Sequence, residues 1–308
     1  MSSIGIDFGG TTIKSGLVLA GEILERGEPI DTQALGDPRH IVDALVDLVK
    51  RLAEHATPPV AIGIGVPGLV DNTTGIVHEL TNVVGWDEVP LRKILHERTG
   101  LPVTIANDAK AMTYGEWKYG AARNARNVVC ITVGTGVGGA LILDGRLYLG
   151  SNFAAGEIGH MSIDYRGRPG PYGNFGGLEE YIGNHQIATR AAERYQAAGR
   201  DLTVEQCSPR RLTEMANAGD PIAKQMWEDL GDELGAALAS VVWIVNPDTI
   251  VIGGGVAKAG ELLFDPVRRS IRARTSDIIH ANLSVVPATL GNDAGIIGNA
   301  TLALESAG

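Results

Sequence analysis

The sequence predicts an α/β fold in two domains, and three observations indicate it. Strand and helix patterns alternate along the chain, which is typical of α/β layers. A strand, a glycine-rich turn and a second strand occur twice, with turns at residues 7–12 and 133–139, which indicates an internal duplication. The 308 residues also exceed what one compact core usually supports. A cleft between two such domains is a common place for a small-molecule site.

The first repeat begins at the first apolar run of the chain. Buried strands are expected at residues 4–7 and 13–19, on either side of the first turn, and residues 20–22 close the second strand. A helix follows, because apolar side chains then recur at helical spacing. Those apolar positions are Ile41, Leu45, Leu48 and Leu52, and they precede a buried strand at residues 60–66 that leads into Pro67 and Gly68.

The second repeat predicts the same order of elements. Strands are expected at residues 128–133 and 140–143, and Asp144-Gly145 then favours a hairpin turn. Asp220 and Pro221 predict the start of a long helix, which runs to about Val245 and is apolar around most of its circumference, so we expect it in the core. The remaining expected elements are a stop at Asn246-Pro247, strands at residues 249–252 and 283–286, and a last helix opened by residues 291–295.

Charge and composition argue against several classes of partner. The formal net charge is −10, and no run of Lys or Arg exceeds an adjacent pair, so we expect no nucleic-acid or membrane partner. The longest nearly apolar stretch, residues 234–245, is shorter than the roughly 20 residues of a membrane-spanning helix. No secretory signal precedes the first strand, and Cys130 and Cys207 have no disulfide or metal spacing. We therefore expect a cytoplasmic protein.

The two glycine-rich turns predict a site for a nucleoside triphosphate. Glycines let backbone N–H groups approach an anion without a Cβ in the way, and threonines add hydroxyl donors. Asn107 and Asp108 follow an apolar run and lie between the two turns in the sequence; a carboxylate there favours phosphoryl transfer. One glycine cluster alone would be an ordinary tight turn. Three clusters after strands, the third at residues 253–255, favour ATP.

These motifs together resemble the ROK family of sugar kinases and repressors. The resemblance rests on Asp-x-Gly-Gly-Thr from Asp7, Gly-Thr-Gly from Gly134, the late glycines, and above all residues 155–160, Ala-Gly-Glu-Ile-Gly-His. It extends from Ile4 to the last helix. Within the family the chain is most similar to bacterial glucokinases, judging from residues 66–68, 107–108, the Glu-x-Gly-His segment and residues 291–297.

The resemblance implies a fold and its division along the chain. Members have the actin and hexokinase fold, which is ribonuclease H-like: two duplicated α/β domains around an interdomain cleft. The smaller domain is expected at residues 1–110 plus 293–308, and the larger domain at residues 111–292. A homodimer is also expected, because relatives are commonly dimeric through the larger domain.

ATP and Mg²⁺ are the cofactors that the resemblance implies. The transferring phosphoryl group needs charge neutralisation and alignment, since its transition state is loose. Asp7 is expected to hold Mg²⁺ through a water molecule, and Lys14 to place a cation near the phosphates. The expected nucleotide-binding residues are Asp7, Gly9, Gly10, Thr11, Thr12, Lys14, Gly134, Thr135, Gly136 and, as the adenosine contact, Gly254 and Gly255.

Asp108 is the candidate general base. Its carboxylate is ionised at neutral pH and can accept the proton of a sugar hydroxyl as that oxygen bonds to phosphorus. The alternative interpretation is a helix N-cap, a role that either Asn107 or Asp108 fills while its neighbour faces the cleft. The expected sugar-binding residues are Gly68 through its backbone, Asn107, Asp108, Glu157, His160 and Glu179. Outside their motifs the two glutamates would be solvated carboxylates, and the histidine would be structural.

One segment departs from the family pattern. Many members carry Cys-x-Cys-Gly-x-x-Gly-Cys-x-Glu after the histidine and bind a structural zinc ion through the three cysteines and that histidine. Residues 170–179 keep the glycines and the glutamate at this spacing but contain no cysteine. We therefore predict no zinc, because His160 alone does not hold it. Packing of Tyr172 and Phe175 is expected to hold the segment instead.

The expected activity is that of an ATP-dependent hexose kinase, a transferase of the glucokinase type, which converts glucose and ATP to glucose 6-phosphate and ADP in glycolysis. A kinase for mannose, fructose, allose or N-acetylmannosamine stays open as an alternative, and so does polyphosphate as the donor. A sugar-sensing ROK regulator is the weaker alternative. Such repressors carry a DNA-binding domain before the first hairpin, where this chain has three residues, and its charge is acidic.

Overall fold

The computed structural model describes residues 1–68, 70–80, 83 and 85–307. By its internal contacts the chain divides into two compact units. Unit 1 comprises Met1–Asn124, Leu147–Ala155 and Thr289–Gly308, and unit 2 comprises Ala125–Arg146 and Gly156–Ala288. The predicted domain boundary at residues 110 and 111 falls inside helix α4 (Asp108–Tyr119), all of which lies in unit 1. The N-terminal unit therefore extends further along the chain than predicted.

Unit 1 is built on a mixed sheet. Strand β1 pairs antiparallel with β2 and parallel with β5, and β5 pairs parallel with β9. From edge to edge the strands are β3 (Glu22–Arg26), β2 (Thr12–Leu19), β1 (Ser2–Phe8), β5 (Pro59–Val66) and β9 (Val103–Asn107), with β4 (Ile30–Asp31) also beside β2. The strands predicted at residues 4–7, 13–19 and 60–66 are confirmed.

The other elements of unit 1 are a small antiparallel sheet and five helices. The small sheet holds β6 (Val70–Asp71), β7 (Ile76–Glu79) and β8 (Asp87–Val89). The helices are α1 (Thr32–Leu35), α2 (Pro38–Ala53), α3 (Leu91–Thr99), α4 and α11 (Ala294–Ala307), and the 3-10 helix η4 (Gly291–Asp293) precedes α11. The predicted helical positions from Ile41 to Leu52 are all buried in α2.

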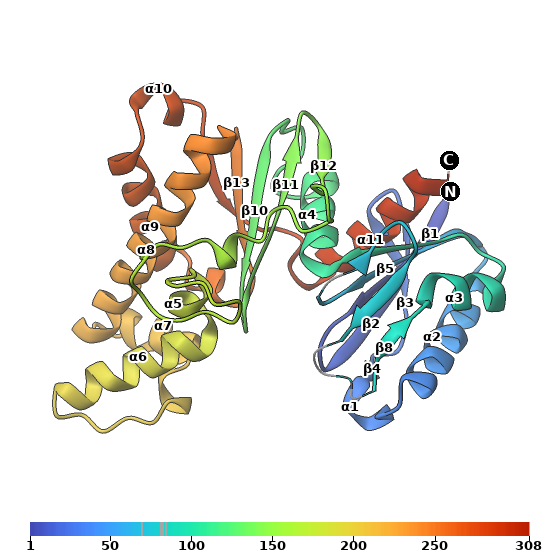
Figure 1. Cartoon of the computed structure of the whole chain (residues 1–308), viewed down its shortest axis with the longest axis horizontal. Helices are drawn as coiled ribbons and strands as arrows, with labels where there is room; N and C mark the ends of the chain where they lie inside the picture. Colours follow the sequence, from blue (N-terminus) through green and yellow to red (C-terminus); the bar gives the residue numbers. More distant parts are fainter. Residues whose placement is uncertain (69, 81–82, 84, 308) are drawn as a thin grey trace. The chain divides into compact units, whose positions relative to one another are not determined.

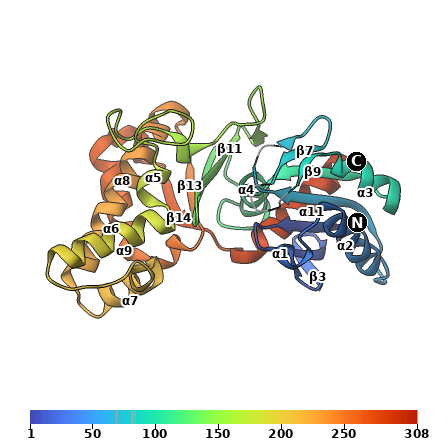
Figure 2. The same ribbon diagram turned by 60° about the horizontal axis from the view of Figure 1, so that its bottom comes forward.

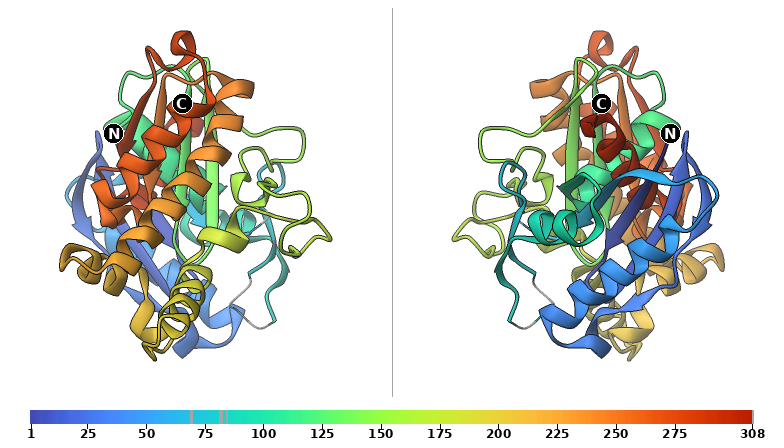
Figure 3. Two further views of the ribbon diagram at one scale, coloured as in Figure 1. Left: turned by 90° about the vertical axis from the view of Figure 1, so that its left-hand side faces the viewer. Right: turned by 90° about the vertical axis from the view of Figure 1, so that its right-hand side faces the viewer.

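The two faces of the main sheet carry different side chains, because successive residues of a strand point to opposite faces. Ile4, Ile6 and Phe8 of β1 belong to the core that also contains the apolar sides of α2 and α3. On the other face, a Cβ on Gly5 or Gly63 would lie within 1.9 Å of a backbone oxygen of α11. Only glycine therefore lets α11 lie this close to the sheet. Helices α2 and α11 can be followed on opposite faces of the sheet in Figures 1 and 3.

A buried carboxylate ties helix α4 to the segment before α11. Glu116 of α4 is fully buried. It accepts hydrogen bonds from the backbone N–H groups of Ala121, Thr289 and Leu290, at 2.8, 3.1 and 2.7 Å. These charge-assisted bonds fix the start of the last helical segment. Sequence reasoning did not identify Glu116, since nothing in the pattern distinguishes it from an exposed acidic residue on a helix.

Unit 2 repeats the sheet of unit 1. The strands are, in order across the sheet, β12 (Arg146–Tyr148), of which Arg146 alone belongs to unit 2, β11 (Val137–Leu143), β10 (Val128–Val133), β13 (Thr249–Gly253) and β14 (Ser284–Pro287). Strand β10 pairs antiparallel with β11 and parallel with β13, as β1 does with β2 and β5 in unit 1. Asp144 and Gly145 have φ values of +51° and +71°, so the predicted hairpin turn forms between β11 and β12. The equivalent pairing order confirms the predicted duplication.

Helices cover one face of this second sheet (Figure 2). They are α5 (Glu179–Ile182), α6 (Asn184–Ala197), α7 (Pro209–Asn217), α8 (Pro221–Val245), α9 (Glu261–Arg274) and α10 (Asp277–His280), with 3-10 helices η1 (Ile158–His160), η2 (Glu205–Cys207) and η3 (Val256–Ala259). Side chains of β10 and β13 join those of α6 to α9 in one apolar core. No helix of the described residues combines the length and apolar character needed to cross a membrane.

Helix α8 confirms the prediction of a long core helix. The carboxylate of Asp220 caps its start by accepting from Ile222 N at 2.9 Å, and Asn246 ends it in the left-handed conformation. Side chains along most of the helix are buried. Its C-terminal end departs from this pattern, since Trp243 and Ile244 are exposed.

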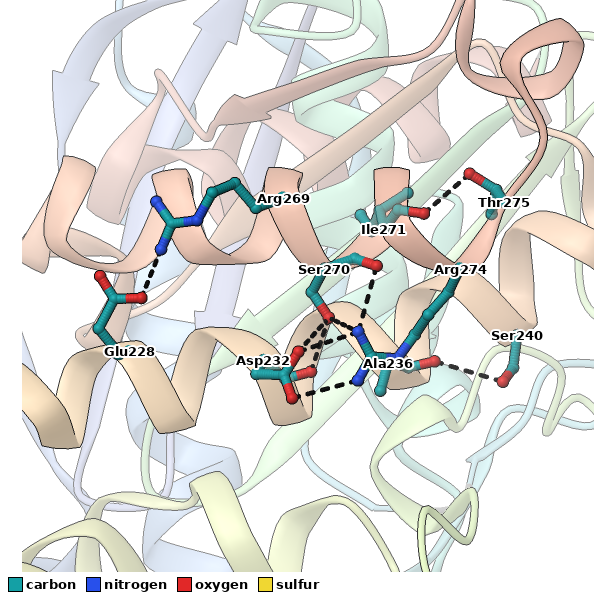
Figure 4. Close-up of polar contacts among 9 residues, drawn as sticks. All are labelled: Glu228, Asp232, Ala236, Ser240, Arg269, Ser270, Ile271, Arg274 and Thr275. Carbon is teal, nitrogen blue, oxygen red and sulfur yellow. Dashed lines mark hydrogen bonds and ion pairs between the residues drawn. The ribbon is translucent and has the colours of Figure 1, made fainter.

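Close packing and a polar row join α8 to α9. A Cβ on Gly235 would lie 2.4 Å from the Ser270 Cβ, so the two helices approach closely at that point. Ser270 Oγ donates to Asp232 Oδ1 at 2.7 Å, and Arg274 Nη2 donates to Asp232 Oδ2 at 3.1 Å (Figure 4). The same figure shows Arg269, the residue before Ser270, reaching Glu228 of α8. These contacts hold the helical layer of unit 2 together.

Candidate active site

The first glycine-rich turn joins β1 to β2 in unit 1. Gly9 N donates to Thr12 O at 3.1 Å, which closes the turn. Thr32, which lies outside the turn, makes two hydrogen bonds to it. Its backbone N–H donates to Thr11 O and its hydroxyl donates to Gly10 O, both at 3.1 Å. The predicted phosphate-binding residues of this turn therefore form one ordered loop at the end of β1.

Asp7 lies at the end of β1, directly opposite Lys14 in the register of β1 and β2. The pKa of Asp7 is raised to about 6: burial of the carboxyl group is the largest cause, the negative charge of Asp108 acts in the same direction, and Lys14 opposes both. A Cβ on Gly295 would lie only 2.9 Å from the Asp7 Cγ. The start of α11 thus covers one side of this carboxyl group, which is mostly ionised at pH 7.

Asn107 and Asp108 stand where β9 passes into α4. Asn107 is the N-cap: its Oδ1 accepts from Ala109 N at 3.0 Å and from Lys110 N at 3.2 Å. Its Nδ2 donates to Gly68 O at 3.3 Å. Asp108 Oδ1 accepts from Ala109 N at 2.8 Å. Asn107 therefore fills the capping role, and its contact with Gly68 joins two of the predicted sugar-binding residues.

The topology of the sheet explains why these residues gather in unit 1. Strands β1, β5 and β9 are parallel, so their carboxyl ends lie at one edge of the sheet. Asp7 is near the end of β1, Gly68 follows β5, and Asn107 ends β9. The carboxyl edge of parallel strands is the usual place for a ligand site in an α/β sheet. The mutual effect of the Asp7 and Asp108 charges agrees with this convergence.

The second glycine-rich turn joins β10 to β11 in unit 2. Gly134 N donates to Gly136 O at 2.9 Å, and Asn184 N donates to Gly134 O at 2.8 Å. Val137 N donates to Glu179 Oε2 at 2.6 Å. Glu179 is therefore not a freely solvated carboxylate. One of its oxygens accepts a hydrogen bond from the backbone of the turn.

The two late glycines differ in what surrounds them. Gly254 has a φ of +86°, and a Cβ there would lie 2.2 Å from Val133 O, so the close approach to β10 by itself requires glycine. Around Gly255 a Cβ would meet nothing within 4 Å. Gly255 thus borders open space, which suits the predicted adenosine contact, whereas Gly254 has a structural reason to be glycine.

Glu157 and His160 lie at η1 in unit 2. Glu157 is its N-cap residue, and His160 N donates to Glu157 O at 3.2 Å. The His160 ring meets the ring of Tyr172 edge-on, with centroids 5.0 Å apart and an interplanar angle of 86°. Tyr172 thus contacts the side chain that sequence reasoning assigned to sugar binding. The motif gave no indication of this contact.

Backbone hydrogen bonds hold the segment between His160 and Glu179. Ile163 N donates to Gly176 O at 2.9 Å, Gly176 N to Arg168 O at 2.7 Å, and Leu178 N to Met161 O at 3.0 Å. The expectation that packing of Tyr172 and Phe175 holds this segment is wrong, since these side chains are 75% and 52% exposed. Leu178, which is fully buried, is the apolar anchor instead.

The sequence-predicted residues thus fall into two groups. Unit 1 holds the first turn, Lys14, Gly68 and the pair Asn107-Asp108, and unit 2 holds the second turn, the late glycines, Glu157, His160 and Glu179. Residues 3–306 match the ROK family. The chain belongs to the ROK family. Its two-domain actin-like fold is that of the family's sugar kinases.

Relatives resemble this ROK protein over nearly its whole length. It is 37% identical to the glucokinase of Halalkalibacterium halodurans, over 97% of this chain and 94% of the relative. It is 32% identical to the glucokinase of Streptomyces coelicolor, over 98% of both chains. The crystal structure of a ROK family glucokinase from Streptomyces griseus, in complex with glucose and AMPPNP, matches it with a TM-score of 0.82 and 33% identity, over 99% of this chain and 100% of that one.

The zinc site that the family pattern implies does not fit the side chains of this ROK protein. Gly170, Tyr172 and Gly177 occupy the positions of the three cysteines. Cys130 and Cys207 are buried elsewhere as free thiols. In the part of the chain that the structure describes, no group of three or more His, Cys, Asp or Glu side chains is arranged to hold a metal ion. That purified protein contains no zinc stays a prediction.

Proposed function

We propose that this ROK protein is an ATP-dependent glucokinase, which transfers the γ-phosphoryl group of ATP to the 6-hydroxyl of glucose. The observation that carries the proposal is the placement of Asp7, Gly68 and Asn107-Asp108 at one carboxyl edge of the unit 1 sheet. The full-length likeness to a glucokinase that binds glucose and AMPPNP supports the choice of substrates.

Asp108 acts as the general base in this proposal. Its carboxylate accepts the proton of the 6-hydroxyl while the sugar oxygen forms a bond to the γ-phosphorus. The bond between that phosphorus and the bridging oxygen to the β-phosphate breaks, and ADP leaves with the electron pair. The hydrogen bond from Ala109 N to Asp108 Oδ1 fixes the orientation of the carboxyl group. A positioned base typically accelerates such a step by about 10²- to 10⁴-fold.

Asp7, Lys14 and the two glycine-rich turns serve the nucleotide. A carboxylate oxygen is the kind of ligand that Mg²⁺ prefers, and Asp7 would hold that ion through a water molecule. When bound, Mg²⁺ neutralises charge on the phosphates. The turns supply backbone N–H groups, Lys14 adds a cation, and the open space at Gly255 suits the adenosine.

Sugar recognition is assigned to the polar groups that the resemblance to glucokinases implies. Asn107 and the backbone at Gly68 are linked to each other by a hydrogen bond, so they are held as a pair. Glu157, His160 and Glu179 add acceptors and a histidine ring. Discrimination between epimers follows, because a sugar with one inverted hydroxyl leaves a polar group of the site without a partner.

The proposal extends to the setting of the enzyme. We expect it to act in glycolysis in the cytoplasm and to form a homodimer, as the resemblance to bacterial glucokinases implies. Size-exclusion chromatography with light scattering measures the oligomeric state directly.

A coupled ADP-release assay with Mg·ATP tests the choice of sugar. Glucose is compared with mannose, fructose, allose and N-acetylmannosamine, and polyphosphate is compared with ATP as the donor. The proposal predicts the highest kcat/KM with glucose and ATP. A higher kcat/KM with another sugar would keep the mechanism but reassign the substrate. Absence of turnover with every sugar would contradict the proposal.

A further inference from the structure

The side chain of Glu179 reaches the backbone of the second glycine-rich turn. Val137 N donates to Glu179 Oε2 at 2.6 Å, a short distance that is typical of a charge-assisted bond. A Cβ on Gly136 would lie 2.6 Å from the same oxygen. The carboxylate therefore occupies the space beside Gly136 and fixes the N–H of the next residue.

The other hydrogen bonds of the turn show what this contact accomplishes. Gly134 is held at both ends, because its N–H donates to Gly136 O and its carbonyl accepts from Asn184 N. The backbone N–H groups of Thr135 and Gly136 donate no hydrogen bond to any part of the chain that the structure describes. Two unused N–H groups thus lie between fixed neighbours, an arrangement that suits an anion such as a phosphate.

Glu179 contacts this turn from a short helix of the same unit. It begins α5, and its backbone carbonyl accepts from Gly183 N at 3.1 Å. The next residue of the chain, Asn184, donates to the turn at Gly134. Helix α5 and the start of α6 therefore support the turn together, and Glu179 supplies the charged contact.

We propose that Glu179 is a positioning residue for the nucleotide as well as a sugar-binding residue: its carboxylate holds the second glycine-rich turn in the conformation that receives phosphate. This inference rests on the proposed function, because it assigns the turn to the nucleotide. It implies that loss of the carboxylate weakens nucleotide binding even when no sugar is present. A residue that only contacts sugar has no such effect.

The test measures the Kd of Mg·AMPPNP in the absence of sugar by isothermal titration calorimetry. Glu179→Ala removes the acceptor of the Val137 N–H and is expected to weaken AMPPNP binding about tenfold. Glu179→Gln keeps an oxygen that accepts from Val137 N, so it is expected to restore most of the affinity. Glu180→Gln alters the neighbouring carboxylate, which among the described residues makes no hydrogen bond to the turn, and is the matched control.

Gly136→Ala provides a reciprocal variant, which leaves the Glu179 side chain in place. The added Cβ displaces the Glu179 carboxylate, so this change is expected to weaken AMPPNP binding in the wild-type background and to cost much less in the Glu179→Ala background. Fully additive losses would overturn the inference. The inference would also be overturned if Glu179→Ala bound AMPPNP with unchanged affinity but bound glucose more weakly. Failure of the wild-type chain to bind AMPPNP would instead contradict the proposed function.

Discussion

Lys14 lies directly opposite Asp7 across the antiparallel pair of strands β1 and β2. The pKa of the Asp7 carboxyl group is raised to about 6, mainly by burial and also by the charge of Asp108, and the lysine opposes this rise. The ionisation of Asp7 therefore depends on a neighbouring cation of β2, the strand that follows the first glycine-rich turn.

The pH dependence of kcat/KM for Mg·ATP follows from this arrangement. Asp7 must be ionised to serve Mg²⁺, so kcat/KM is expected to fall as the pH drops below about 6. Lys14→Met removes the charge that lowers the Asp7 pKa, so the acidic limb is expected to move to higher pH. Lys50→Met, a change at an exposed residue of α2, is the control. An acidic limb at the same pH in Lys14→Met would contradict the assignment.

Asp7→Asn is expected to raise the free energy of unfolding while it lowers activity. Because folding raises the pKa of Asp7 above its unfolded value, its contribution favours the folded state below about pH 4 and is lost as the pH rises through 6. The neutral variant lacks the cost of ionising a buried carboxyl group, so its free energy of unfolding should be about 3 kcal/mol higher at pH 8. Urea denaturation at pH 8 measures it. Equal or lower stability of Asp7→Asn would be inconsistent with a carboxylate whose burial lowers the free energy of unfolding.

Asn107 is expected to matter for both stability and sugar binding. Asn107→Ala removes the cap of α4 and the contact with Gly68 O, so the free energy of unfolding should fall by about 1 kcal/mol. The KM for glucose should rise as well. Asp37→Ala removes the cap of α2 in the same unit, where Asp37 Oδ1 accepts from Arg39 N at 2.7 Å. It should cost similar stability without changing KM, and a similar rise in both variants would reject a direct role for Asn107.

Tyr172 stands at the position of a family cysteine and contacts His160, the remaining member of the family's zinc-binding set. Edge-on aromatic contacts contribute about 0.5–1.5 kcal/mol, so Tyr172→Ala is expected to raise the KM for glucose about 2- to 10-fold. Tyr172→Phe keeps the ring and should behave like wild type. Phe175→Ala removes another exposed ring of the same segment and is the control.

The same account predicts that chelators leave the melting temperature and activity unchanged when Mg²⁺ is resupplied. Stoichiometric zinc in purified, unsupplemented protein, measured by elemental analysis, would refute the prediction that no zinc is bound.

For Tyr172→Ala, an unchanged KM for glucose would show that the Tyr172 ring does not position His160.

Local chemistry explains which parts of the fold were predictable. The bounds of α8 follow from Asp220-Pro221 and Asn246-Pro247, because capping and proline geometry act within a few residues. The paired strands around each glycine-rich turn follow from apolar runs and turn residues for the same reason. The short strands of the β6–β8 sheet lack such patterns. The boundary near residue 124 depends on the packing of α4 against α11, a contact between segments far apart in the sequence.

In the candidate site, too, local patterns were predictable from the sequence and contacts between distant segments were not. Motifs indicated Asp7, Asn107 and Asp108 because each follows a strand pattern. The contacts of Glu116 with Leu290, Tyr172 with His160, and Glu179 with Val137 join residues that are 12 to 174 positions apart. Such contacts arise only when the elements pack, so sequence patterns did not reveal them.

The most direct test of the central claim compares wild type with Asp108→Asn in the ADP-release assay with Mg·ATP and glucose. Calorimetry on the same proteins measures the binding of glucose and AMPPNP. The account predicts glucose-dependent turnover in the wild type and a kcat that is about 10²- to 10⁴-fold lower in the variant, with binding of both ligands retained. Wild-type kcat in Asp108→Asn would contradict the assignment of the general base.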